Sequence, residues 1–244
     1  MRATGAARPA CAGRRRTLGA VGLALAAGLS AAAPTSAQVP PGAAEVQAYR
    51  GLHAAAWRGD AAAVPTLLAG GADPNGRDGR GRTPLHVAAH ARRLDALRAL
   101  VRGGADLGAF DADRYDAVTI AAVADDEVTL ALLLGLGADA RLITSRYDGT
   151  ALIAAAHLGH DGVVRQLIAA GAPLDHVNNL HWTALIEAVV LGDGGPRHQA
   201  TLKALLEAGA DPRLADCSGR TPLQLARSRG HTAMARLLEA AGAR

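Results

Sequence analysis

The sequence predicts an all-α solenoid of about six helix-turn-helix repeats, and two observations lead to this prediction. A Gly-Ala pair recurs in steps of 33, 33, 34, 38 and 33 residues, at positions 71–72, 104–105, 137–138, 171–172, 209–210 and 242–243. Aromatic residues make up 2% of the 244 residues, whereas glycine occurs 29 times. Scarce strand formers argue against a β-sandwich or barrel, and frequent glycines suit many helix ends. The chain therefore resembles a stack of short helices that repeats along its length.

Two apolar columns keep the same register in all six copies. One column, in the first helix of each copy, is alanine throughout: Ala55, Ala88, Ala121, Ala155, Ala188 and Ala226. Three residues before each alanine stands an aliphatic residue: Leu52, Leu85, Val118, Leu152, Leu185 or Leu223. Each copy is too small to bury its own apolar face, so the stability of the fold should come from stacking neighbouring copies.

The second copy shows how one unit should be built. Residues 78–82 combine Asp and Arg with two glycines, which is typical of a turn. Thr83 can cap the first helix, and Pro84 suits its first turn. A second helix follows through Leu100, and Gly104 should end it. Each copy therefore predicts a turn and two helices.

The motifs TPLHVAA at 83–89 and GGAD at 103–106 resemble the ankyrin repeat. The third copy departs most, because it lacks the Thr-Pro start, but its Ala and Leu columns are intact. The resemblance implies paired antiparallel helices, β-hairpin fingers, a concave face and a protein partner. The implied repeats span approximately 48–77, 78–110, 111–143, 144–177, 178–215 and 216–244.

Residues 1–37 have the pattern of a cleaved signal peptide. Residues 14–16 are arginines, residues 17–33 form an apolar run, and Thr-Ser-Ala at 35–37 suits cleavage. The run is shorter than the ~20 residues that span a bilayer, so we expect no membrane span after cleavage. The general secretory and twin-arginine routes both stay open. Residues 38–47 would then form a short linker.

The basic charge of the chain belongs to this leader. The chain has 26 basic and 22 acidic side chains, and five of the basic ones lie in residues 1–37, so 21 basic side chains remain. A near-neutral body offers no electrostatic surface for nucleic acid. After cleavage Cys217 is the remaining cysteine, which rules out an intramolecular disulfide. We expect a monomer in the bacterial envelope, periplasmic or secreted.

Aromatic and basic side chains mark the candidate partner-binding surface. Tyr115 and Trp182 occupy the same repeat position as Arg82 and Arg220, and Tyr147 lies in the finger between the two aromatic residues. Exposed aromatic side chains beside arginines are typical of protein-binding hot spots, although such rings also fill gaps between fingers. The full candidate set is Arg80, Arg82, His90, Tyr115, Tyr147, His157, Trp182, Glu187 and Arg220.

No catalytic motif, cofactor fingerprint or metal-ligand spacing is present, so we expect a binding module that is not an enzyme and has no cofactor. One alternative is an envelope factor with a polar or metal-binding site around His90, His157 and Glu187. Another is a secreted effector that binds a host protein. The five-residue insertion at 192–198 should form an elaborated turn that projects away from the fingers.

The leader pattern predicts that the mature protein begins at or near Gln38, because the small residues at 35–37 suit a signal peptidase. Mass spectrometry of the N-terminal peptide from the native, soluble protein should find this terminus. An intact Met1 terminus in that pool would contradict the prediction.

Overall fold

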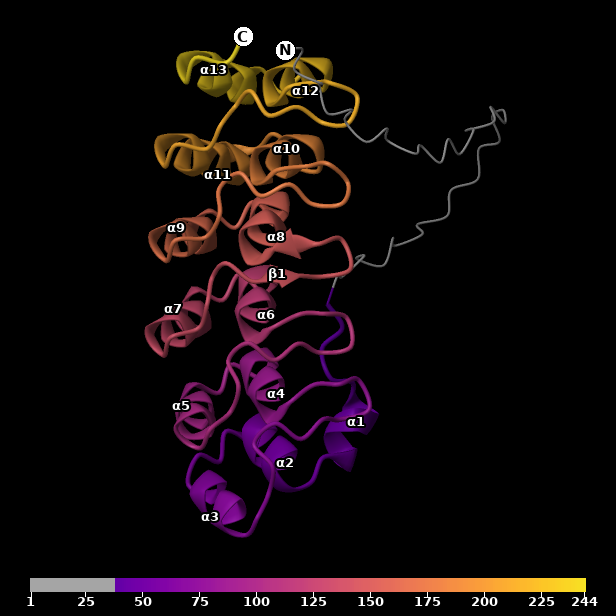
Figure 1. Cartoon of the computed structure of the whole chain (residues 1–244), viewed down its shortest axis with the longest axis vertical. Coiled ribbons are helices and arrows are strands. Elements are labelled where there is room, and N and C mark those ends of the chain that lie inside the picture. Colours follow the sequence, from indigo (N-terminus) through magenta and orange to yellow (C-terminus); the bar gives the residue numbers. More distant parts are fainter. Residues whose placement is uncertain (1–37) are drawn as a thin grey trace, which may run out of the picture. The chain divides into compact units, whose positions relative to one another are not determined.

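Six helix pairs follow one another in a stack (Figure 1). The structure is a computed structural model that describes residues 38–244, and the predicted signal peptide lies outside these residues. The first helices, called inner helices, are α2 (Gly51–Arg58), α4 (Pro84–His90), α6 (Ala117–Val123), α8 (Ala151–Leu158), α10 (Ala184–Val190) and α12 (Pro222–Ser228). The second, outer helices are α3 (Ala63–Ala69), α5 (Leu94–Arg102), α7 (Glu127–Gly135), α9 (Asp161–Ala169), α11 (Pro196–Glu207) and α13 (Thr232–Ala240). No helix within residues 38–244 is long and apolar enough to cross a membrane.

The inner and outer helices form two layers. Each inner helix packs on the next inner helix, and each outer helix packs on the next outer helix. The six alanines of the first-helix column are 0–1% exposed, so they lie where consecutive inner helices meet. Small side chains at these positions let the helix backbones approach closely, and the aliphatic column completes the core between the layers.

Helix ends follow the sequence pattern. The hydroxyls of Thr150 and Thr183 accept hydrogen bonds from the backbone N–H three residues further on, at 3.3 Å. In the third repeat, the carboxylate of Asp116 takes this role at 2.8 Å from the Thr119 nitrogen. The glycine of each Gly-Ala pair has a φ of 80–99°, a left-handed conformation that ends the outer helix at little steric cost.

Fingers project from the inner-helix side of the stack (Figure 1). Each finger takes the number of the repeat whose inner helix it precedes. In finger 2 (residues 78–82) the Asp78 nitrogen donates to the Arg82 carbonyl at 3.0 Å, and fingers 3, 5 and 6 (residues 111–115, 178–182 and 216–220) close in the same way. Finger 4 holds an antiparallel strand pair, β1 (Ile143–Thr144) and β2 (Gly149–Thr150), with Ile143 opposite Thr150. The other four closed fingers are turns too short for a strand ladder.

Neighbouring fingers are linked to one another. The Asn179 nitrogen in finger 5 donates to the Tyr147 carbonyl in finger 4 at 2.9 Å. Fingers 3 and 4 carry two ion pairs, Arg114–Asp148 at 3.1 Å and one between Arg146 and Asp113. In finger 3 the Ala112 nitrogen also donates to the Arg80 carbonyl of finger 2 at 2.9 Å. Fingers 2 to 5 are therefore joined into one edge.

Residues 38–47 correct the linker prediction, because they fold onto the repeats. Helix α1 (Ala43–Ala48) lies beside α2, on the side of the inner helices that faces away from the outer layer (Figure 1). The Glu45 carboxylate is 2.6 Å from the Arg82 guanidinium, and the Tyr49 hydroxyl donates to Asp78 at 2.8 Å. Ion pairing across 37 residues of sequence thus recruits this segment into the domain.

The alanine column predicts the cost of filling it. Ala121→Leu should lower the free energy of unfolding by ~1–3 kcal/mol, because the larger side chain overpacks the contact between α6 and its neighbours. Arg236→Gln is the control, since Arg236 is exposed on α13 and should change stability by less than ~0.5 kcal/mol. Urea unfolding measures the stability of both variants. Equal stability of the two variants would contradict the predicted repeat register.

Candidate functional site

Glu187 is a carboxylate in an otherwise apolar column. The matching residues of the other inner helices are Ala54, Val87, Ile120, Ala154 and Leu225. Glu187 lies on α10 and is 4% exposed. Removing a carboxylate from water costs free energy unless partners compensate. The groups around Glu187 therefore decide how it is stabilised.

Asn178 is the direct partner of Glu187. Its Nδ2 donates to Glu187 Oε1 at 3.0 Å, while its Oδ1 accepts from the Leu180 and Trp182 nitrogens at 3.0 Å and shapes finger 5. Asp78, Asp111 and Asp216 shape fingers 2, 3 and 6 through the same oxygen contacts. An amide at this position can donate to Glu187, whereas an aspartate would repel it.

His157 approaches Glu187 from the neighbouring repeat. Its Nδ1, at the end of α8, is 3.6 Å from Glu187 Oε2, which is too long for a hydrogen bond. Burial raises the pKa of Glu187 to about 7, and the Asn178 hydrogen bond opposes part of this rise. Burial also lowers the pKa of His157, with help from His198 and His160. At neutral pH the imidazole is therefore neutral and does not balance the carboxylate charge.

Exposed apolar side chains lie on the same two repeats as this pair. Tyr147 and Leu180 lie on fingers 4 and 5, and Leu158 and Leu191 lie at the ends of α8 and α10; all four are 39–50% exposed. Trp182 is partly buried against the core at the base of finger 5. We call the following set the repeat 4–5 surface: Tyr147, His157, Leu158, Leu180, Trp182, Glu187 and Leu191.

Two predicted contact residues are buried, which corrects the expectation that they are exposed. Arg82 is 1% exposed, because its guanidinium is held between Asp78 at 2.8 Å and Glu45 at 2.6 Å. Tyr115 is 5% exposed and belongs to the hydrophobic core. Both side chains stabilise the fold and do not present a surface to a partner.

The predicted polar triad is not assembled. His157 and Glu187 meet, but His90 lies on α4, and α6 separates α4 from α8. Burial, followed by Arg82 and His86, lowers the pKa of His90 to about 4. Over residues 38–244 there is no group of three His, Cys, Asp or Glu side chains that could hold a metal ion.

The remaining predicted arginines are exposed but far apart along the stack. Arg80, in finger 2, is 3.5 Å from Glu45, and Arg220, in finger 6, is 2.9 Å from Asp216. Each is engaged by a local carboxylate, so neither belongs to the repeat 4–5 surface.

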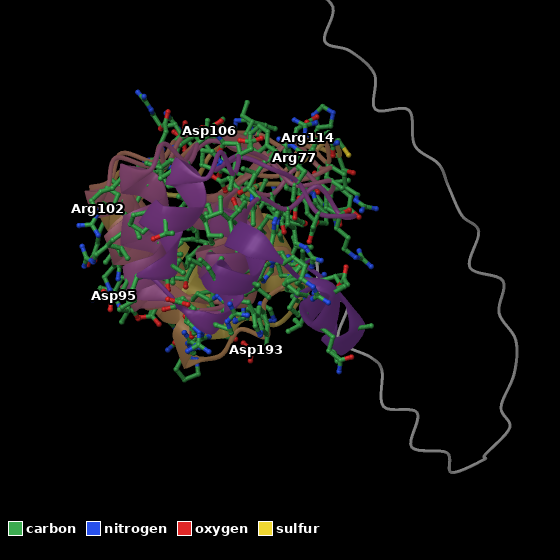
Figure 2. The ribbon with its side chains drawn as sticks, turned by 90° about the horizontal axis from the view of Figure 1, so that it is seen from below. Arg77, Asp95, Arg102, Asp106, Arg114 and Asp193 are labelled. Atoms are coloured by element: carbon green, nitrogen blue, oxygen red, sulfur yellow. The ribbon has the colours of Figure 1, made fainter. Side chains whose placement is uncertain are left out.

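The inserted turn lies on the side opposite the fingers, where Figure 2 shows Asp193 far from Arg77 and Arg114. The His198 ring contacts the His157 carbonyl at 3.0 Å and the Asp193 carboxylate at 2.8 Å. Arg197 reaches Asp125, two repeats back, at 2.8 Å. The insertion therefore ties repeats 3, 4 and 5 together.

Leu158 and Leu191 were missed at the sequence level. Their column otherwise holds Arg58, Ala91, Ala124 and Arg229, so a column-by-column comparison of repeats could have found them. The hollows of about 400 Å³ between α5 and α7 and about 420 Å³ between α9 and α11 lie in the outer layer. They are remote from Glu187 and carry no comparable polar centre.

Glu187→Gln should change how stability depends on pH. A carboxyl whose pKa rises from 4.5 to about 7 on folding stabilises the fold below pH 4.5 and loses that contribution as pH rises through 7. Gln resembles the protonated form and does not titrate. The free energy of unfolding of the variant, relative to that of the native protein, should therefore rise by on the order of 1–3 kcal/mol from pH 5 to pH 8.

Urea unfolding at the two pH values measures this gain. Glu207→Gln is the control, because the Glu207 side chain is 67% exposed and its replacement should leave the pH dependence of stability unchanged. Parallel pH profiles for the native protein and Glu187→Gln would show that Glu187 is not buried in this way.

Comparisons with known proteins agree with this fold. Models of three consecutive ankyrin repeats match residues 52–144 and 120–216, and a single-repeat model matches residues 218–244. The ankyrin repeat protein YahD of Escherichia coli K12 is 39% identical over 190 residues, which cover 78% of this chain and 94% of YahD.

Solved structures give the same result. An ankyrin repeat domain from Acinetobacter baumannii is 44% identical, with a TM-score of 0.74, and the match covers 79% of this chain and 98% of that one. A chain in the complex of a predatory endopeptidase from Bdellovibrio bacteriovorus with an immunity protein is 26% identical, with a TM-score of 0.66 and coverage of 79% and 98%. The chain belongs to the ankyrin-repeat family, whose repeats mediate protein–protein interaction.

Proposed function

We propose that this chain is an exported ankyrin-repeat scaffold that binds a protein partner through the repeat 4–5 surface. The observation that carries the proposal is the presence of four exposed apolar side chains and a buried carboxylate on two adjacent repeats. The proposed site shares Tyr147, His157, Trp182 and Glu187 with the set expected from sequence.

The position of α1 supports this location. Near repeats 1 and 2 the inner-helix side is engaged by α1, since Glu45 reaches Arg82 and Arg80 and Val46 packs against the core. No contact of this kind from α1 reaches repeats 4 and 5 among the described residues. A partner can therefore reach the inner helices there without displacing part of the chain.

The chemistry of the surface suits a protein. Hot spots combine apolar or aromatic anchors with a polar centre that becomes dry on binding. Here Tyr147 and Leu180 would contact the partner from the fingers, Leu158 and Leu191 from the helix ends, and Glu187 lies between them. The fingers around this surface are linked by hydrogen bonds, so binding should order little additional backbone.

Export is the second part of the proposal and rests on the leader pattern of residues 1–37. We propose that the mature protein acts as a monomer in the bacterial envelope, either retained in the periplasm or secreted. The solved complex of an endopeptidase with an immunity protein contains a chain of similar fold. It is a precedent that makes endopeptidases a first class of partner to test.

Affinity capture from the native envelope, with the mature protein as bait, should supply the partner. Tyr147→Ala and Trp182→Ala should then each weaken binding by at least ~2 kcal/mol, the usual scale for a hot spot. Val128→Ala is the matched control, because Val128 is 63% exposed on outer helix α7 and lies in the other layer. Calorimetry measures affinity, and a melting curve for each variant measures folding.

Full affinity for Tyr147→Ala, combined with a loss for Val128→Ala, would move the interface to the outer helices. Tyr147 is the cleaner test, because Trp182 also packs against the core. Recovery of the mature protein from culture medium together with a host protein would favour the secreted effector.

A further inference from the structure

Glu187 lacks the arginine partner that most of the other buried acids have. The side chains of Asp78, Asp126 and Asp216 are 9%, 8% and 3% exposed, and each has an arginine within 2.8–3.4 Å. Asp116, which is 1% exposed, has no such arginine among the described residues, but its carboxylate caps α6 by accepting from the Thr119 nitrogen at 2.8 Å. Glu187 has no lysine or arginine within 4 Å among residues 38–244. Its neighbours are the Asn178 amide and the His157 ring.

This arrangement leaves the site short of positive charge. The Asn178 Nδ2 donates one hydrogen bond to Glu187 Oε1. The Asn178 Oδ1 accepts from backbone nitrogens of finger 5 and shapes that finger. His157 Nδ1 is 3.6 Å from Oε2 and forms no hydrogen bond there. A carboxylate binds a guanidinium or ammonium group strongly because charge-assisted hydrogen bonds can form in a partly dry site.

We propose that Glu187 is the receptor for a cationic side chain of the protein partner, an arginine or lysine that inserts at the repeat 4–5 surface. The inference deepens the proposed function and rests on it. The aliphatic stem of such a residue would pack against exposed Leu158 and Leu191 while its head group pairs with the carboxylate.

Other occupants fit less well. An anionic group would be repelled by the carboxylate. An apolar group would remove more water from the carboxylate without forming a compensating ion pair. A metal ion would find two side chains, His157 and Glu187, and no third His, Cys, Asp or Glu in the described chain. Charge complementarity therefore selects the cation.

Binding should strengthen as pH rises, since deprotonation of Glu187 creates the negative charge. The titratable groups near it are His157 on α8 and, behind it, His160 and His198. On the next repeat, Arg220 is paired with Asp216 and Arg227 with Glu239. Protonation of His157 at low pH also opposes a cation, so both groups act in the same direction.

The test uses two acetylated, amidated tripeptides, Leu-Arg-Leu and its counterpart with citrulline, the neutral isostere of arginine. Binding to the mature protein and to each variant is followed by nuclear magnetic resonance shifts of the backbone amides of α8 and α10. The arginine peptide should bind at least about fivefold more tightly than the citrulline peptide at pH 8. It should bind more tightly at pH 8 than at pH 6, by up to about tenfold, because the ionised fraction of a group with pKa about 7 rises by that factor.

Glu187→Gln should abolish both differences while keeping the hydrogen bond from Asn178. His157→Gln should keep the pH effect, which separates the two titrating groups. Equal binding of the two peptides, or no binding of either, would overturn the inference. If a captured partner depends on Tyr147 but binds Glu187→Gln with full affinity, the interface stands and the cation receptor does not.

Discussion

The close contact between consecutive inner helices is the constraint on which the rest of this structure depends. Six alanines occupy that contact, and all are 0–1% exposed. Because each repeat buries its apolar face against its neighbours, the alanine position must remain small in every copy for the stack to keep a constant spacing. That spacing also sets the distance between successive fingers, which is short enough for hydrogen bonds and ion pairs to link them. The edge formed by the fingers is therefore a consequence of the helix packing.

A framework that relies on a few columns leaves other columns free to vary. The column that holds Glu187 is apolar in the five other repeats, and a carboxylate there costs stability that the rest of the stack must supply. Repeat 5 makes two local adjustments around it: Asn178 replaces the aspartate of most other fingers, and Trp182 replaces the arginine that would pair with that aspartate. A destabilising group that is supported in this way is typical of a binding site.

The N-terminal segment decides which part of the inner face is open. Arg82 is buried because Glu45, which belongs to α1, and Asp78 hold its guanidinium. The same position in finger 6, Arg220, pairs with its own aspartate, within residues 38–244 no helix like α1 engages it, and its side chain is exposed. One repeat position therefore holds a structural arginine at one end of the stack and a surface arginine at the other. The proposed binding surface lies in repeats 4 and 5, where apolar side chains are exposed.

The sequence alone determined the repeat register, the six helix pairs, the glycines that end the outer helices and the ankyrin-repeat family, because these follow from local spacing that recurs in each copy. From the sequence, Tyr147, His157, Trp182 and Glu187 are predicted partner-binding residues, and that remains a prediction. Burial of Arg82 and Tyr115, the folding of residues 38–47 onto the repeats and the separation of His90 from the pair depended on tertiary structure. The physical reason is that burial and ion pairing also depend on groups distant in sequence, such as Glu45, which lies 37 residues from Arg82, and no local pattern encodes these contacts.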